Sequence, residues 1–324
     1  MEQTTAPRLD LAQFSAQVRQ IKEKIARVVV GHNQVVDLLI AAILADGHVL
    51  LEGVPGVAKT LLARLTARLI DARFSRIQFT PDLMPSDVLG TTVFNMKTSE
   101  FDFHEGPIFA NMVLVDEVNR APAKTQSALF EVMEERQVSI DGVTHHMEEP
   151  YTIIATQNPV EQEGTYKLPE AQLDRFMFKI VMGYPTLEEE KIILQRHQAN
   201  ARLAKLEDVK PIISKESLLA LRDTMGAVLI DDSLLGYIAQ IVHQTRTSKA
   251  VLLGASPRAA VAMLQASKAI ALIYGRDFVT PDDIKMVAPA VLDHRILISA
   301  EAEMQGYTAS KIAATLVNNV EVPK

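Results

Sequence analysis

The spacing of apolar and polar positions changes along the chain and separates a front part with strands from a back part made of helices. Short, largely apolar runs, typical of strands buried on both faces, begin near residues 49, 111, 151 and 176, and Arg76-Ile77-Gln78-Phe79 is interpreted as a further strand. Segments with helical spacing lie before and between these runs, at about 11–30, 33–45, 59–70 and 122–136. Strands that alternate with helices predict an α/β fold, a doubly wound parallel sheet covered on both faces.

Two further segments of the front part predict insertions that protrude from the core. Aromatic and polar residues alternate between residues 91 and 109, which favours a short helix or a hairpin. Residues 137–147 form two alternating runs around Asp141-Gly142, and Asp-Gly between such runs is a strong signal for a hairpin with a type I′ turn.

After Gly183 the apolar runs stop, and helix-start signals follow one another. Thr186 and Ser214 stand at N-cap positions, and Ser256-Pro257 and Thr280-Pro281 place proline at the first helical position. We therefore expect a core domain over residues 1–184 and a smaller, all-helical domain over residues 185–324.

The stretch from Val49 to Leu62 carries the clearest chemistry, because a buried strand, a glycine-containing loop and a helix start follow in that order. Gly53 and Gly56 allow backbone N–H groups to turn toward an anion. Lys59 can reach the outer phosphates of a nucleotide, and the Thr60 hydroxyl is placed to bind Mg²⁺. Ala58 stands where the general pattern has glycine, and we expect it to have right-handed helical angles, which alanine prefers.

Two other patterns point to the same chemistry. The run from Asn111 to Val115 ends in Asp116-Glu117, at the carboxyl end of a buried strand, where α/β sheets gather their ligands. Val30-Gly31-His32 lies just before a helix, where its backbone could flank an adenine ring or simply form a turn.

Composition limits the class of protein. The formal net charge of -7 argues against broad binding to nucleic acid or anionic membranes, and the absence of cysteine excludes thiolate metal sites and disulfides. The longest apolar run, near residues 38–45, is far too short to span a bilayer, so we expect no membrane insertion. Because residues 1–10 are polar and lack the apolar core of a signal peptide, we expect a cytoplasmic protein.

These motifs together resemble the MoxR family of AAA+ ATPases, and the likeness covers nearly the whole chain. The family's P-loop, which also has alanine before the lysine, is similar to Gly53-Val54-Pro55-Gly56-Val57-Ala58-Lys59-Thr60. The other matching segments are 78–87, Asp116-Glu117-Val118-Asn119-Arg120, Ala155-Thr156-Gln157-Asn158-Pro159, 168–176 and Ser256-Pro257-Arg258-Ala259. The resemblance implies a P-loop AAA+ ATPase domain over 1–184, with a helix-2 insert at about 91–109 and a pre-sensor hairpin at about 137–147, and a lid over 185–324.

The resemblance also implies roles for single residues. Asp116 would bind Mg²⁺ through water, Glu117 would polarise the attacking water, and Asn158 would fix that water against the γ-phosphate. The whole loop from Gly53 to Leu61 would contact the nucleotide, Val30, Gly31 and His32 would flank the adenine, and Arg258 would contact the same nucleotide from the lid. Arg175 would act as an arginine finger in the site of the next subunit, and Arg120 is its rival.

At the level of function, the resemblance implies an ATPase that uses ATP and Mg²⁺, forms a homo-oligomeric ring, a hexamer, and acts as a chaperone. Its partner would be a client protein, remodelled or activated together with a von Willebrand factor A domain protein and often for metal-cofactor insertion. Two alternatives stay open. The first is a motor stimulated by nucleic acid, against which the two insertions supply only Lys97 as a lysine or arginine. The second is a scaffold that binds ATP without hydrolysing it, against which Glu117 and Asn158 argue.

Overall fold

The computed structural model describes residues 11–158, 166, 168–198 and 209–323. The chain folds into two compact units, Ile25–Lys215 and Met1–Lys24 with Glu216–Lys324. The sequence pattern places the domain boundary after residue 184, where the sheet ends, whereas in the structure the next helix, α7 (Leu187–Gln198), belongs to the first unit.

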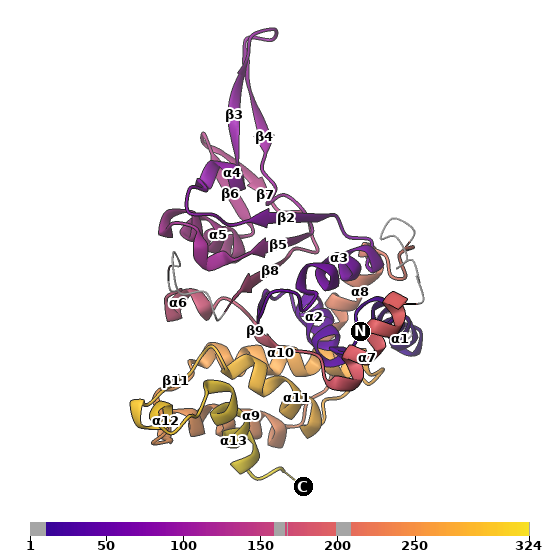
Figure 1. The fold of residues 1–324 in the computed structure, drawn as a ribbon, viewed down its shortest axis with the longest axis vertical. Coiled ribbons are helices and arrows are strands. Elements are labelled where there is room, and N and C mark those ends of the chain that lie inside the picture. The colour runs from indigo at the N-terminus through magenta and orange to yellow at the C-terminus, as the bar shows by residue number, and fades with distance from the viewer. Residues whose placement is uncertain (1–10, 159–165, 167, 199–208, 324) are drawn as a thin grey trace, which may run out of the picture. The chain divides into compact units, whose positions relative to one another are not determined.

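A five-stranded parallel sheet forms the centre of the first unit (Figure 1), as the alternating pattern predicts. Its order is β2-β5-β8-β1-β9, and every neighbouring pair is parallel. The strands are β1 (Val49–Gly53), β2 (Phe74–Gln78), β5 (Met112–Asp116), β8 (Thr152–Gln157) and β9 (Phe178–Met182). Because neighbouring parallel strands have their carboxyl ends on the same side of the sheet, this register brings the last residues of β1, β5 and β8 together.

The inner strands β1, β5 and β8 are buried on both faces, which explains their unbroken apolar runs. All five residues of β5 are buried. Val113 and Val115 share a core with Leu129 and Met133 of helix α5 (Ala123–Glu135), so Leu114 between them points to the opposite face. In the described part of this unit the other helices are α2 (Asn33–Leu44), α3 (Lys59–Leu69), α4 (Pro85–Leu89), the 3-10 turn Val118–Arg120, α6 (Glu170–Leu173) and α7.

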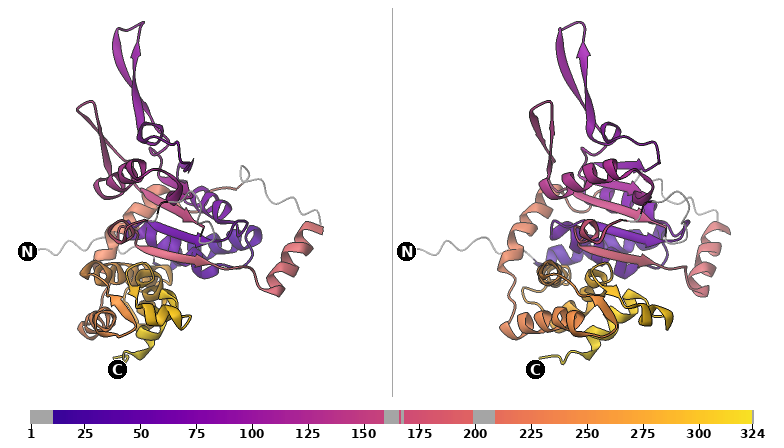
Figure 2. Two further views of the ribbon diagram at one scale, coloured as in Figure 1. Left: turned by 60° about the vertical axis from the view of Figure 1, so that its left-hand side comes forward. Right: turned by 90° about the vertical axis from the view of Figure 1, so that its left-hand side faces the viewer.

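Both predicted insertions are β-hairpins that project from the sheet (Figures 1 and 2). The longer pairs β3 (Gly90–Asn95) with β4 (Glu100–Glu105), and the shorter pairs β6 (Gln137–Ile140) with β7 (Val143–His146). Asp141 and Gly142 have φ angles of 51° and 81°, so the type I′ turn is confirmed. The Phe103 and His145 rings, 4.2 Å apart between centroids, join the two hairpins.

The second unit is predominantly helical, as expected, and its start signals lie where the sequence places them. Thr280 and Asp283 form a capping box on α11 (Pro281–Leu292), and Pro257 opens α10 (Pro257–Ile273). Its other helices are α1 (Leu11–Val28), which extends across the division into the first unit, α8 (Lys215–Thr224), the 3-10 turn Met225–Ala227, α9 (Asp232–Thr247), α12 (Ala300–Met304) and α13 (Ala309–Asn319). The apolar pattern missed two short antiparallel strands, β10 (Val251–Leu253) and β11 (Leu297–Ile298), because each is too brief to show a period.

No helix in the described part of the chain is both long enough and apolar enough to cross a bilayer.

Ala58, directly before α3, corrects one expectation from the sequence. Its φ of 62° and ψ of 23° lie in the left-handed region, not in the right-handed helical region. An L-residue with a Cβ pays about 1–2 kcal/mol there, and glycine does not. The loop therefore keeps the backbone conformation that glycine favours, although its residue is alanine.

We predict that Ala58→Gly raises the free energy of unfolding by about 0.5–1 kcal/mol, because relief of the left-handed strain exceeds the greater entropy of glycine in the unfolded chain. Chemical denaturation followed by circular dichroism measures the change. Ala63→Gly, at a fully buried position inside the same helix, is the matched control and should lower stability. A destabilised Ala58→Gly protein would contradict the strain.

His48, just before β1, is a buried histidine held in its neutral form. Its Nδ1 accepts a hydrogen bond from the Ile153 N–H (2.9 Å), so Nε2 donates to the Met133 carbonyl (3.1 Å). Burial, and then the charge of Arg136, lower the pKa of His48 to about 3.

We predict that the protein loses about 2 kcal/mol of stability between pH 7 and pH 5 through His48. The pKa in the unfolded chain is 6.5 and in the folded chain about 3. The unfolded state therefore binds the proton first, and stability falls as the pH drops below 6.5. His48→Gln, neutral at both pH values, should be less stable at pH 7 and show a correspondingly smaller drop in its urea midpoint. An equal drop in both proteins would contradict this role.

Candidate functional site

A cavity of about 360 Å³ lies at the carboxyl ends of the parallel strands, where the sequence predicts the nucleotide. It brings together five predicted residues from three separate segments: Lys59, Thr60, Asp116, Glu117 and Asn158. Pro55, Gly56, Ala58 and Leu61 of the predicted loop also line it, and so do Arg76, Gln78 and Thr156.

The loop between β1 and α3 has the geometry of a phosphate cradle. A Cβ on Gly53 would lie 2.6 Å from the Met182 carbonyl oxygen, so only glycine allows this close approach. Gly56 has space for a Cβ, but its φ of 90° is a backbone conformation that L-residues with a side chain rarely adopt. The Lys59 Nζ donates to the Gly53 carbonyl at 2.6 Å, which holds the ammonium over the loop. Backbone N–H groups at the start of α3 and this ammonium together suit an anion.

Asp116 is a buried carboxylate held from two sides. Its Oδ2 atom lies 2.6 Å from the Arg76 Nε, and its Oδ1 accepts a hydrogen bond from the Thr156 hydroxyl at 3.1 Å. The Thr156 oxygen in turn accepts the backbone N–H of Glu117 at 3.0 Å. The Thr156 side chain therefore holds both the Asp116 carboxylate and the backbone N–H of Glu117.

Glu117 leaves the strand in the left-handed region, with φ of 57°, and this turn separates its side chain from that of Asp116. Its Oε2 accepts a hydrogen bond from Gln78 Nε2 at 2.9 Å and lies 3.2 Å from Arg120 Nε. Asn158 lines the same cavity and is 8% exposed. Pro159, which follows it in the predicted motif, lies outside the described residues.

The cavity contains three polar residues to which the sequence patterns assigned no role: Arg76, Gln78 and Thr156. Arg76 and Gln78 are two positions apart on β2, so their side chains share a face of that edge strand. A polar pair at alternate positions of a predicted strand beside the acidic pair was the signal that could have identified them.

The donor set suits Mg²⁺. The Asp116 carboxylate and the Thr60 hydroxyl line one cavity, and Mg²⁺ prefers such oxygen ligands while it keeps several waters and substrate phosphates. Among the described residues, no group of three or more His, Cys, Asp or Glu side chains could hold a metal by itself. A bound Mg²⁺ would therefore depend on the nucleotide for part of its coordination.

The three arginines of interest lie in different places. Arg175, between α6 and β9, donates to the Phe130 carbonyl at 2.6 Å and lies 3.5 Å from the Glu134 carboxylate, both on α5. Arg120 pairs with Glu117 of its own chain. Arg258 is the second residue of α10 in the second unit and is exposed. To reach the site of a neighbouring subunit, Arg175 would have to give up its contacts with α5.

Val30, Gly31 and His32 do not line the cavity. Gly31 and His32 both have positive φ angles, 77° and 62°, and a Cβ on Gly31 would lie 2.6 Å from Glu189 Oε1. Burial lowers the pKa of His32, and the nearby Glu189 carboxylate opposes that shift. Their contact with adenine stays a prediction.

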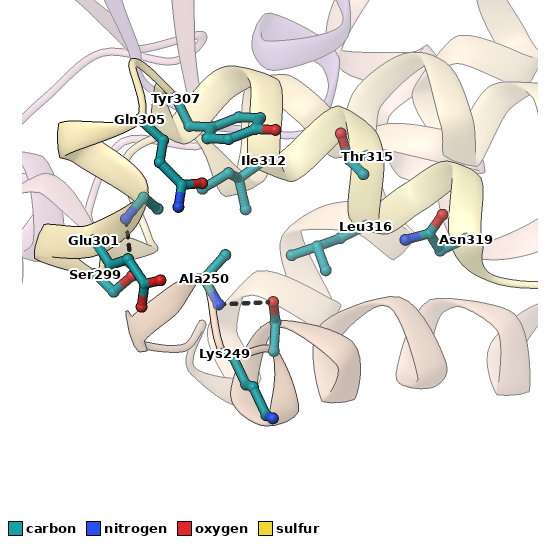
Figure 3. Close-up of a pocket in the computed structure, with 12 residues that line it drawn as sticks. Lys249, Ala250, Ser299, Glu301, Gln305, Tyr307, Ile312, Thr315, Leu316 and Asn319 are labelled. Carbon is teal, nitrogen blue, oxygen red and sulfur yellow. Dashed lines mark hydrogen bonds between the residues drawn. The ribbon is translucent and has the colours of Figure 1, made fainter.

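The second unit has a larger cavity, of about 420 Å³, with a different character (Figure 3). Ile312 and Leu316 of α13 give it an apolar side, and Lys249, Glu301 and Gln305 place polar groups around it. It contains none of the predicted cradle residues. The predicted phosphate-binding and carboxylate groups therefore gather in the smaller cavity and not in this one.

Comparisons with known proteins agree with this geometry. The model of the ATPase family associated with various cellular activities (AAA) matches residues 48–178, and the AAA lid domain model matches residues 243–316. The uncharacterized protein YeaC of Bacillus subtilis is 49% identical, and the match covers 93% of each chain. Chaperone MoxR1 of Mycobacterium tuberculosis is 43% identical over 93% of this chain and 81% of the relative.

The fold is shared with a solved structure as well. A crystal structure from Cytophaga hutchinsonii, of a protein assigned as an ATPase, has 42% identity and a TM-score of 0.87, and the match covers 97% of each chain. The cavity with its P-loop and strand-end carboxylates, the AAA matches and a relative named MoxR1 along nearly the whole chain lead to one conclusion: this protein belongs to the MoxR family of AAA+ ATPases.

Proposed function

We propose that this protein hydrolyses ATP with Mg²⁺ in a cytoplasmic, homo-oligomeric ring, a hexamer, and uses the cycle to remodel or activate a client protein. The observation that carries the ATPase proposal is the convergence of Lys59, Thr60, Asp116, Glu117 and Asn158 in one cavity. Phosphate binding, metal binding and water activation each have a suitable group there.

The reaction assigns a separate task to each side chain. The Lys59 ammonium exchanges the Gly53 carbonyl for phosphate oxygens and offsets their charge. Asn158 holds the attacking water, and Glu117 accepts its proton while the water oxygen bonds to the γ-phosphorus. The bond from that phosphorus to the β,γ-bridging oxygen breaks, and the products are ADP and phosphate. Bound Mg²⁺, held by Thr60 and by Asp116 through water, would neutralise charge on the β- and γ-oxygens.

The longer hairpin, β3 with β4, supports a protein as the client. Phe94 and Phe101 form an edge-to-face pair on the longer hairpin, with ring centroids 5.1 Å apart, and are 50% and 72% exposed. Exposed aromatic groups of this kind are typical of protein contact sites. M. tuberculosis MoxR1 is named a chaperone. A von Willebrand factor A domain partner and a metal-cofactor role are parts of the proposal that rest on the family resemblance alone.

Charge on the same hairpin disfavours nucleic acid. Glu100, Asp102 and Glu105 lie on β4, and the only lysine or arginine of the hairpin is Lys97. A DNA strand would meet net negative charge. ATP turnover that rises when DNA is added would favour the nucleic-acid alternative instead.

We predict that Glu117→Gln keeps ATP affinity while turnover falls by about a hundredfold or more, because the amide cannot accept the proton from water. Lys59→Ala should weaken ATP binding itself. Equilibrium binding of a fluorescent ATP analogue and phosphate release give the two readouts. Glu131→Gln, which changes an exposed glutamate of α5 outside the cavity, is the matched control. Turnover by Glu117→Gln at the parent rate would show that Glu117 is not the group that accepts the proton from water.

The second prediction tests whether Arg175 acts on a neighbouring subunit. Arg175→Ala and Glu117→Gln subunits should each bind ATP and be nearly inactive alone. Mixed, they should recover activity, because an intact Arg175 can serve the intact Glu117 of an adjacent subunit. The contribution of an arginine finger, about a thousandfold or more, gives ample range.

The interactions of Arg175 with α5 call for a structural control. Glu134→Gln removes its ion-pair partner and leaves the arginine in place, so this variant should stay active. If mixed rings form by pull-down and recover no activity at any ratio, a finger at Arg175 is ruled out. The same mixing with Arg120→Ala then tests its rival.

A further inference from the structure

We propose that Arg76 is a competitor of Mg²⁺ for the Asp116 carboxylate and thereby sets how strongly nucleotide binding depends on the metal. The inference rests on the proposed nucleotide site and deepens it, because it assigns a positioning role to a residue that no motif covers. In this role Arg76 acts through Asp116 and does not contact the phosphates.

The first observation is the pairing itself. The Arg76 Nε lies 2.6 Å from Asp116 Oδ2, the distance of a charge-assisted hydrogen bond. Thr156 holds the other carboxylate oxygen. A divalent cation near Asp116 would lie within a few ångströms of the guanidinium charge. Two positive charges at such a short distance inside a cavity repel each other strongly. Full use of Asp116 by Mg²⁺ therefore requires Arg76 to move away.

The second observation shows which partner can move. The Arg76 side chain is 52% exposed, whereas that of Asp116 is 10% exposed. Asp116 is fixed at the end of an inner strand, while Arg76 extends from β2 at the edge of the sheet. The arginine can turn into water at little desolvation cost, and the carboxylate cannot leave its site.

The third observation concerns charge when Mg²⁺ is not bound. Asp116 lines the cavity that would receive a polyanionic nucleotide, and an unpaired carboxylate there would repel the phosphates. Arg76 offsets this negative charge. Removal of the Arg76 guanidinium should therefore weaken nucleotide binding without metal and strengthen nucleotide binding with Mg²⁺, so the two effects have opposite signs.

The experiment measures Kd for a fluorescent, non-hydrolysable ATP analogue in EDTA and in saturating Mg²⁺. The Kd in EDTA divided by the Kd in Mg²⁺ reports how strongly the metal promotes nucleotide binding, and its measurement requires no turnover. We expect Arg76→Gln to increase this ratio by about tenfold or more, because Mg²⁺ can then use the Asp116 carboxylate without displacing a guanidinium partner. Arg76→Lys should keep a ratio near that of the parent, and Arg64→Gln, at an exposed arginine of α3 outside the cavity, should leave it unchanged.

A double-mutant cycle with Asp116→Asn separates this role from direct phosphate contact. If Arg76 acts through the carboxylate, Arg76→Gln should not change the ratio or the metal-free Kd in the Asp116→Asn protein. A persistent loss of metal-free binding there would mean that the guanidinium binds phosphate, which overturns the proposal. A ratio that is unchanged or smaller in the single variant would also overturn it.

The same data distinguish failure of this inference from failure of the nucleotide site. If the parent protein binds the analogue with a clear Mg²⁺ dependence and Arg76→Gln does not increase that dependence, the role of Arg76 is wrong and the nucleotide site stands. If the parent protein does not bind the analogue at all, both proposals fall. Circular dichroism melting of each variant shows that a changed ratio comes from a folded protein.

Discussion

The burial of one negative charge, that of Asp116, governs the arrangement of the site. A carboxylate at the end of an inner strand has little water, so the protein must supply partners for it. Thr156 comes from the neighbouring strand β8 and Arg76 from the neighbouring strand β2, so both flanking strands contribute. The parallel register that aligns these three strands is therefore a condition for the chemistry as well as for the core.

Much of the fold follows from local pattern. Inner strands such as β5 are buried on both faces, so their sequences are unbroken apolar runs and identify themselves. The turn of β6 and β7 is also local, because Asp141-Gly142 tolerates positive φ. The lid strands β10 and β11 depend on pairing between segments far apart in the chain, and two or three residues give no period that reveals it.

The site divides in the same way. Lys59, Thr60, Asp116 and Glu117 stand in recognisable order along the sequence, and the fold brings them to one cavity. Arg76 and Gln78 are recognised only after the register of β2 with β5 is known, because their partners lie about forty residues away. The conformation of Ala58 does not follow from the intrinsic preference of alanine, because the loop imposes left-handed backbone angles at this position.

Helix α5 links the chemistry to the hairpins as a mechanical element. Gln126 near its start bonds to the Val118 carbonyl beside Glu117, and its last turn leads through Arg136 directly into β6. With 13 residues it is about 20 Å long. The contact between His145 and Phe103 ties the second hairpin to the first. A small tilt of helix α5 at the end near Glu117 would therefore move both hairpins together. The hairpin tips would move farther than the residues near Glu117, because they lie farther from that end of the helix.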